Sequence, residues 1–306
     1  MILSVLLAIL FIVAFWYGLV PFAGGFLNRY KWRRFRNRYN DMRLSPLLDY
    51  RQYRQLGKEG GIFRFSGNIE SITDSHTLWV RGDDLTIPVS LSKTKCFLLP
   101  IHEGDKLPEA PEQIRWNRVS TLTEGSKVFI GGQLETHDNR LNFVSSKEQP
   151  LVVIFYNCPD AELSSAIIRS ARTRNDYWNN ITPISIAIGA ATLIYIAASL
   201  LGRPAFRFTV ISVLISVFIP ILPIFPPGFL FTVMYRRLSW NARKLRAYWD
   251  LAHYGLLSGA PKNTTKRYAL RAYTLEIIAW VIMLFGICIN IFFIYLILYL
   301  FQVISF

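Results

Sequence analysis

Residues 28–58 read NRYKWRRFRNRYNDMRLSPLLDYRQYRQLGK, and this stretch decides how the rest of the chain is arranged. It carries ten basic residues against only two acidic ones, Asp41 and Asp49. It directly follows residues 1–27, which contain no charged side chain. Basic segments beside a membrane span stay on the cytoplasmic side. We therefore expect this run to set the orientation of the whole protein in a membrane.

The composition points in the same direction. The chain has 306 residues, 52% of them hydrophobic, and a net charge of +14. The apolar residues are bunched into blocks, which is typical of membrane spans rather than of one large core. A positive excess beside such blocks favours an anionic membrane surface over nucleic acid as the partner. The three cysteines are too few and too scattered to predict a disulfide framework or a zinc site.

The apolar blocks predict a multi-pass α-helical membrane protein with four transmembrane helices. Residues 1–27 form an anchor, retained because its basic residues come after the apolar part and not before it. Residues 181–234 form a hairpin of two spans, and residues 275–306 form the last span. The second span of the hairpin should be kinked or broken, because it contains four prolines, Pro220, Pro223, Pro226 and Pro227.

Four spans place the segments between them on alternating sides. Residues 28–60, 61–157, 158–180 and 235–274 share one side, and the two basic segments among them make that side cytoplasmic. Both termini and the turn at residues 202–207 are then outside. In a bacterium the expected location is the inner membrane.

Two segments have the pattern of amphipathic helices. In residues 28–60 the aromatic positions recur at spacings of three and four, and residues 235–274 carry a comparable apolar stripe. We expect both to lie on anionic headgroups, with a solvated basic linker as the alternative for the first. Ser45-Pro46 and Gly57 should bound a second short helix of the first segment, and Gly259 and Pro261 should end the second segment's helix. The expected membrane-surface residues are Arg29, Lys31, Trp32, Arg33, Arg34, Arg36, Arg38, Arg236, Arg237, Trp240, Arg243, Lys244 and Arg246.

Between Gly61 and Tyr156 the hydrophobic period changes to two, which predicts strands. Six to eight short strands indicate a small antiparallel β barrel or sandwich, OB-like, over residues 61–157. Hairpin turns are expected at residues 82–84 and 137–139, and a surface loop at 102–113. Pro88 should confine its strand to a sheet edge. A linker helix should follow in residues 158–180.

Candidate chemical groups are sparse. The four histidines, His76, His102, His137 and His253, lack ligand spacing, and turn residues explain those in the predicted hairpins. We therefore expect no catalytic residue, no metal site and no cofactor. The polar residues of the last span are Glu276, near Arg271 at the cytoplasmic end, and Asn290, expected to make a helix–helix hydrogen bond.

Residues 120–200 resemble the membrane-side (GIDE, or beside-a-membrane) domain of mitochondrial multi-pass E3 ubiquitin ligases. The matching features are Leu122-Thr-Glu-Gly125, Gly132-Gln-Leu134, Leu141, and the passage through Asp160 and Leu163 to Trp178 and the following span. The chain lacks the Cys/His zinc module of those ligases. The resemblance therefore implies a binding or scaffolding module and not ligase activity.

The sequence favours a non-enzymatic scaffold or regulatory subunit that presents its β domain to a protein partner at the membrane. We expect no binding of nucleic acid. The sequence is compatible with a homo-oligomer. The alternative is a small transporter or channel component whose third and fourth spans line a path.

Overall fold

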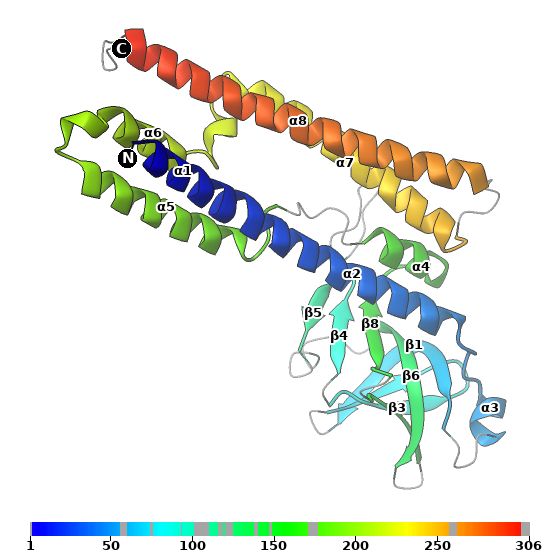
Figure 1. The fold of residues 1–306 in the computed structure, drawn as a ribbon. Helices are drawn as coiled ribbons and strands as arrows, with labels where there is room; N and C mark the ends of the chain where they lie inside the picture. The colour runs from blue at the N-terminus through cyan, green and yellow to red at the C-terminus, as the bar shows by residue number, and fades with distance from the viewer. Residues whose placement is uncertain are drawn as a thin grey trace. The chain divides into compact units, whose positions relative to one another are not determined.

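The computed structural model describes residues 2–55, 60–73, 76–92, 94–100, 110–115, 119, 125–137, 140–146, 149–170, 177–256 and 262–300 (Figure 1). The chain forms two compact units. The helical unit comprises Met1–Lys31, Arg174–Trp249 and Ala260–Phe306. The barrel unit comprises Trp32–Thr173 and Asp250–Gly259.

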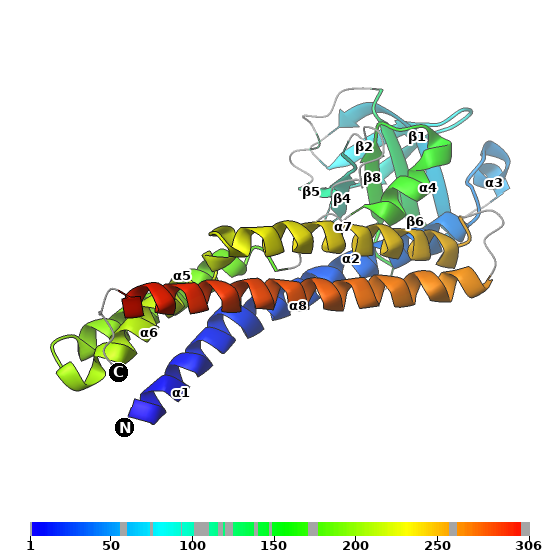
Figure 2. The ribbon, with the colours of Figure 1, turned by 90° about the horizontal axis from the view of Figure 1, so that it is seen from above.

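Among the described residues, three helices are long and apolar enough to cross a membrane: Leu3–Leu44, Thr182–Leu200 and Lys266–Leu300. The first combines α1 (Ile2–Val13), a π-helical segment (Ala14–Leu19) and α2 (Val20–Leu44); the others are α5 (Thr182–Leu200) and most of α8 (Lys262–Leu300). Within the helical unit, the start of α1, the α5–α6 connection and the end of α8 lie at the same end in both Figure 1 and Figure 2.

The predicted third span is not one continuous helix. Helix α6 (Arg207–Val217) is followed by turns with one 3-10 segment, Leu222–Ile224, and α7 (Gly228–His253) begins only after Pro227. Prolines cannot donate the backbone hydrogen bond that continues a helix. The break therefore lies where the four prolines predict it, and it divides the apolar block into two helical pieces.

The π-helical segment of the first span also has a proline as its cause. Pro21 has no N–H to donate to the carbonyl of Tyr17, and its ring crowds that carbonyl. The backbone widens over Ala14–Leu19, directly before Pro21. A local π-helix inside an α-helix relieves this crowding without ending the helix.

The basic run does not form a separate surface helix. Helix α2 continues from the span through the basic residues to Leu44. The expected cap at Ser45-Pro46 is wrong, because α3 (Tyr50–Gln55) begins after Asp49, whose carboxylate accepts the Gln52 N–H at 2.7 Å. Such an N-terminal acceptor satisfies an otherwise free helix donor. Gly57 lies outside the described residues.

Helix α7 likewise continues from the broken span into the second basic segment. It ends at His253, earlier than Gly259 and Pro261 predict. Gly255 adopts a φ of 69°, in the left-handed region that favours glycine, and the Leu256 N–H bonds to the Leu251 carbonyl at 2.9 Å. This left-handed turn closes the helix end. Gly259 and Pro261 lie outside the described residues.

The barrel unit contains a closed five-stranded barrel with extra strands. Its strands are β1 (Ile62–Thr73), β2 (Thr77–Arg81), β3 (Thr86–Ser90), β4 (Lys95–Leu98), β5 (Glu112–Ile114), β6 (Lys127–His137), β7 (Arg140–Val144) and β8 (Val152–Tyr156). The sheet order is β1-β2-β3-β7-β6-β8-β4-β5, and pairing of β1 with β6 closes the first five strands. All neighbours are antiparallel except β3–β7 and β4–β8, which are parallel.

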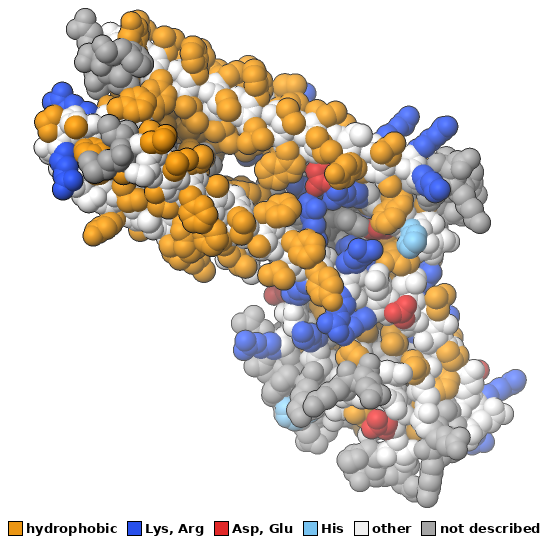
Figure 3. All heavy atoms as spheres, viewed as in Figure 1, with side chains coloured by type: hydrophobic (Ala, Val, Ile, Leu, Met, Phe, Trp, Pro, Cys, Tyr) orange, Lys and Arg blue, Asp and Glu red, His pale blue; other side chains and the backbone are white. Residues whose placement is uncertain are grey.

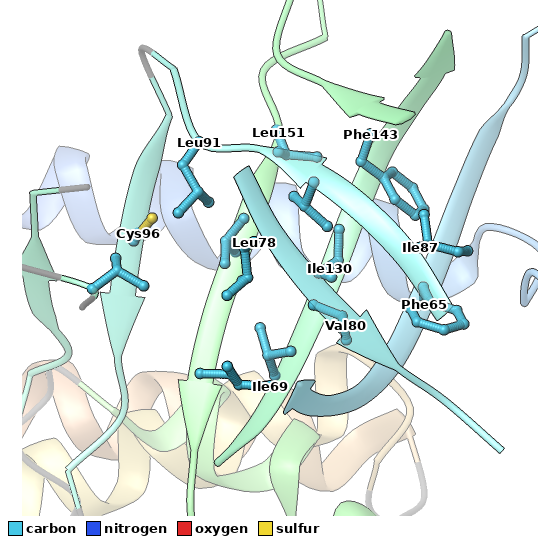
Figure 4. Close-up of a cluster of buried hydrophobic side chains, with 14 of the residues drawn as sticks. Phe65, Ile69, Leu78, Val80, Ile87, Leu91, Cys96, Ile130, Phe143 and Leu151 are labelled. Carbon is cyan, nitrogen blue, oxygen red and sulfur yellow. The ribbon is translucent and has the colours of Figure 1, made fainter. Parts of the chain in front are cut away.

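Side chains fill the inside of this barrel (Figure 4). Leu78, Ile87, Ile130 and Phe143 are fully buried there, and Phe65 and Leu91 pack with them. The alternation of apolar residues along the strands places one set inward, as the period of two requires. A barrel of this size has an interior just wide enough for its own side chains.

Strand β8 is buried on both faces. Val153 and Phe155 belong to the barrel core, whereas Val152, Ile154 and Tyr156 face a second cluster formed with α2 and α4 (Asp160–Arg169). This is why its sequence is a continuous apolar run rather than an alternating one.

Pro88 does not lie on an edge strand, so this prediction is wrong. Strand β3 lies between β2 and β7. Its pairing with β7 is confined to one register position, Val89 opposite Phe143, so the missing N–H of Pro88 interrupts no long ladder. The predicted turn at 82–84 joins β2 to β3, with the Gly82 N–H bonded to the Leu85 carbonyl at 2.8 Å. Of the predicted loop 102–113, residues 102–109 lie outside the described residues, and Glu112 and Gln113 belong to β5.

Candidate functional site

The aromatic face of the basic run lies inside the barrel unit and not on lipid. Trp32, Phe35 and Tyr39 are buried, and they pack against β8 and α4. The Tyr39 hydroxyl is 2.8 Å from the Ser164 hydroxyl. The expectation that Trp32 contacts the membrane surface is therefore wrong. The outer face of β8 is apolar, and the aromatic side chains of α2 bury it. The spacing of these aromatic residues predicts a buried helix face but does not show what the face packs against.

Gly131 helps α2 to approach the sheet closely. A Cβ at this position would lie 2.6 Å from the Cβ of Met42, closer than side chains pack. Only a glycine at this position of β6 therefore leaves room for Met42, which follows Trp32, Phe35 and Tyr39 on the same face of α2.

The other expected membrane-surface residues divide into three groups by exposure. Arg36 is buried, so its assignment to the membrane surface is also wrong. The exposed residues are Arg29, Lys31, Arg33, Arg34, Arg236 and Arg237, and the partly buried ones are Arg38, Trp240, Arg243, Lys244 and Arg246. The Lys244 ammonium lies 5.8 Å from the centre of the Trp240 ring, which allows a cation–π contact.

Buried Arg36 joins α2 to the last residues of α7 within the barrel unit. Its Nε lies 3.9 Å from Asp250 Oδ2, and both side chains are almost fully buried. Arg36 also donates to the carbonyl of Ser170 at 3.5 Å. Removing one partner of a buried ion pair leaves an uncompensated charge, so this pair fixes the pairing of the two helix ends.

Tyr254 extends the same contact. Its hydroxyl donates to Asn37 Oδ1 at 2.6 Å, and its carbonyl accepts a hydrogen bond from Arg43 at 3.2 Å. The second basic segment thus ends on the first one, an arrangement that neither segment's sequence indicates by itself.

Glu276 bridges two arginines of the helical unit. Its carboxylate accepts a hydrogen bond from Arg29 at 2.9 Å and another from Arg246. Arg29 belongs to α2 and Arg246 to α7, so one carboxylate of α8 joins three helices. The sequence placed Glu276 near Arg271, five residues earlier on its own helix. Its carboxylate instead contacts arginines of two other helices.

Asn290 lies at the break of the predicted third span. Its amide oxygen accepts the Gly228 N–H at 3.1 Å, and its amide nitrogen donates to the carbonyls of Leu222 and Phe225 at 2.5 and 3.1 Å. Thr232 donates to the Pro223 carbonyl at 2.5 Å. The Leu222 and Phe225 carbonyls also accept the N–H groups of Phe225 and Phe229, so Asn290 adds a second hydrogen bond to each of them.

Close packing supports this Asn290 contact. A Cβ at Gly228 would overlap the Asn290 amide, and a Cβ at Gly286 would lie 2.8 Å from the Cβ of Phe231. Small residues that let helices approach in this way are typical of packing within membranes. The predicted helix–helix hydrogen bond of Asn290 therefore exists, but its partners are the broken backbone and not another side chain.

The sequence interpretation missed a third polar cluster, at the π-helical segment. Tyr177 donates its hydroxyl proton to the Tyr17 carbonyl at 2.7 Å, which is the carbonyl that Pro21 deprives of its helical partner. Asn179 donates to the Pro21 carbonyl at 2.9 Å, and Ser185 donates to the Trp16 carbonyl. A proline four residues after Tyr17 was the signal that could have pointed to this need.

The remaining candidates form no reactive cluster. Among the described residues, no group of three or more His, Cys, Asp and Glu could hold a metal ion. Cys96 is buried in the barrel core, and burial raises its pKa to about 12. His102 and Asp138 lie outside the described residues. His76 and His253 fall in no such group.

Hydrophobic side chains cover most of the visible face of α1, α5 and α8 in Figure 3. This exposure agrees with helices that face lipid. Comparison of the chain with protein-family models, with curated proteins and with solved structures finds no match.

Proposed function

We propose that this chain is a four-span membrane protein whose β domain, on the cytoplasmic side, recruits a protein partner to the membrane. The observation that carries the proposal is the closed barrel with its interior filled by side chains. A filled barrel acts through its outer surface, since it has no lumen for a ligand. The candidate spans keep that surface at a membrane.

The strand order supports an OB-like barrel. Numbered along the chain, the five closing strands pair first with second, second with third, third with fifth, fifth with fourth and fourth with first. The parallel pair is third with fifth, β3 with β7. The OB-fold is a five-stranded Greek-key barrel of this kind that serves many binding functions.

A fourth span is supported by the repaired break. Non-helical backbone is tolerated at membrane depth when its polar groups are satisfied within the protein. Asn290 and Thr232 bond to four backbone groups at residues 222–228. Helix α6, the break and the start of α7 then cross together, which leaves both termini outside.

The exposed basic residues of α2 and α7 support contact with anionic headgroups. Arg33, Arg34, Arg236 and Arg237 are exposed beside apolar helices, where each cation contributes about 1 kcal/mol of attraction near an anionic surface. The likeness of residues 120–200 to the GIDE domain remains a proposal that agrees with this role. Its first motif residues, Leu122 to Glu124, lie outside the described residues.

The transporter alternative draws on the same break, because discontinuous helices often line transport sites. However, the amide oxygen and nitrogen of Asn290 are already bonded to backbone groups, and Glu276 is bonded to two arginines. Polar groups that are engaged in this way hold helices together rather than coordinate a passing ion. We therefore favour the scaffold.

Purification from native cells in a mild detergent tests the proposal. A scaffold should bring a stoichiometric protein partner with it, and the partner should be lost when residues 61–157 are deleted. A variant with Asn290 replaced should keep the partner if it is still inserted in the membrane. Absence of any stoichiometric partner from the full-length protein, combined with solute flux that depends on Asn290 and Pro223 in vesicles, would establish the transporter instead.

A further inference from the structure

Exposed large hydrophobic side chains are confined to one region in the described part of the barrel unit. Leu44 is 72% exposed, Leu47 52%, Tyr50 42% and Ile62 36%. In the rest of the described barrel unit, large hydrophobic residues are buried or half-buried. A contiguous patch of exposed apolar residues on a soluble domain often marks an interaction site.

Backbone pairing brings these residues together. Residues 46–48 lie along the start of β1, with the Leu48 N–H bonded to the Arg64 carbonyl at 2.9 Å and the Arg64 N–H bonded to the Pro46 carbonyl at 3.0 Å. Leu47 is therefore opposite Arg64 in a parallel bridge. Ile62 shares the face of Arg64, because alternate residues of a strand point the same way. Phe65, on the other face, lies in the barrel core.

Leu44 and Tyr50 lie on either side of Leu47 in the chain, at the ends of the two neighbouring helices. Leu44 is the last residue of α2, three residues before Leu47, and Tyr50 is the first residue of α3, three residues after it. We refer to Leu44, Leu47, Tyr50 and Ile62 as the 44–62 patch.

Two arginines of α3 give the patch a positive charge. Arg51 and Arg54 are exposed, and the Arg54 guanidinium lies 4.9 Å from the centre of the Tyr50 ring. Among the residues that the structure describes, neither arginine has an ion pair. The nearest carboxylate in sequence, Asp49, already accepts the Gln52 N–H. Tyrosine and arginine are among the residue types that dominate binding energy at protein interfaces.

Charge and length argue for the occupant. Face-to-face contact with a second copy across a two-fold axis would bring the arginines of both copies together, which is repulsive. A lipid surface is a poorer fit, because α3 has only six residues and interfacial helices are much longer. The candidate spans already supply membrane attachment.

We propose that the 44–62 patch binds an acidic segment of a partner protein that inserts apolar side chains between Leu47 and Ile62 and pairs its carboxylates with Arg51 and Arg54. This inference rests on the scaffold function, and it specifies which surface of the β domain the partner occupies and the charge of the bound segment.

A displayed library of random peptides, selected against the full-length protein in nanodiscs of neutral phosphatidylcholine, tests this site. The enriched peptides should combine Asp or Glu with Leu, Ile or Phe. The variants Leu47→Glu and Arg51→Glu/Arg54→Glu should each weaken binding of a synthetic enriched peptide by at least about tenfold. Arg140→Glu reverses one charge at an exposed position of the β6–β7 hairpin, outside the patch, and should leave the affinity unchanged.

Three results would overturn the inference. The first is enrichment of peptides without acidic residues, or of none. The second is equal loss of affinity in Arg140→Glu. The third is that the patch variants instead lose binding to phosphatidylserine liposomes or lose self-association by analytical ultracentrifugation. Thermal unfolding of each variant shows whether it is folded, and the double arginine variant serves if Leu47→Glu is not.

The native partner separates this inference from the scaffold proposal. If the partner still co-purifies with the Arg51→Glu/Arg54→Glu variant, the scaffold function holds and the 44–62 patch is not its docking site. If no partner co-purifies with the unaltered protein, the scaffold function itself fails.

Discussion

At the scale of single residues, Asn290 makes three hydrogen bonds with one side chain. It accepts one N–H and donates to two carbonyls at the proline break. The Asn290→Leu variant should lower the free energy of unfolding in detergent by about 1–3 kcal/mol, because the buried Gly228 N–H loses its acceptor. Cys288→Ser, an exposed change two residues away, should have no measurable effect. Equal stability of the Asn290→Leu variant and the unaltered protein would contradict this role.

Cys96 should report on the barrel core. Burial raises its thiol pKa from 9.0 to about 12. Between these values the unfolded chain releases the proton while the folded chain retains it, so stability should fall by roughly 1.4 kcal/mol per pH unit as the pH rises above 9. Below pH 9 the thiol is neutral in both states and contributes no pH dependence.

The measurement is the free energy of unfolding at several pH values for the protein and for Cys96→Ala. The variant should lack this alkaline loss of stability. Partly exposed Cys158 should react with a maleimide reagent before Cys96 does, since Cys96 becomes accessible only on unfolding. Rapid labelling of Cys96 in the native protein would show that the core is open.

At the scale of elements, a hydrogen bond at the π-helical segment joins the first candidate span to the residues that precede α5. Tyr177 donates to the Tyr17 carbonyl because Pro21 cannot. Tyr177→Phe should therefore cost about 1 kcal/mol of stability. In a Pro21→Ala background residue 21 regains its N–H, so the same change should cost much less. A double-mutant cycle measured by unfolding in detergent checks this coupling. Additive effects would show that the Tyr177 hydroxyl does not act through that carbonyl.

The sequence predicted whether most elements are helices or strands, but not which elements pack against each other. Alternation predicted the strands, and the apolar blocks predicted the membrane-spanning candidates. The aromatic stripe of Trp32, Phe35 and Tyr39 was identified as a helix face, yet its partner was assigned to lipid. A periodic pattern shows which side of a helix is covered but not by what. The cover is β8, more than a hundred residues away in the chain.

The same limit applies to the polar contacts. Asn290 was predicted to make a helix–helix hydrogen bond, and it bonds to Gly228, the first residue of α7. That it repairs the break at residues 218–227 depends on a fold in which α8 lies against that break, which local spacing does not encode. The pairs Arg36–Asp250 and Arg29–Glu276 likewise join segments separated by more than two hundred residues. Opposite charges at such separations have many alternative partners in a sequence with 34 basic residues.

At the scale of the whole molecule, charge asymmetry carries the predicted orientation. Residues 29–58 contain ten basic residues and residues 236–271 contain nine, whereas the turn at residues 202–207 contains only two. The positive-inside rule therefore predicts that the barrel unit is in the cytoplasm and the turn outside. The native cysteines are poor reporters of this orientation, because Cys96 is buried on whichever side it lies.

Introduced cysteines in a cysteine-free background give a direct test, since exposed side chains react without prior unfolding. Arg203→Cys, in the exposed turn, should react with a membrane-impermeant maleimide in intact cells. Arg81→Cys in the barrel and Arg236→Cys in α7 are equally exposed, and both should react only after the membrane is permeabilised. Because Arg81 and Arg236 belong to different loops between spans, their agreement also tests the fourth, broken crossing. If Arg236→Cys labels from outside while Arg81→Cys does not, residues 207–234 re-enter the same side, and the chain crosses the membrane three times.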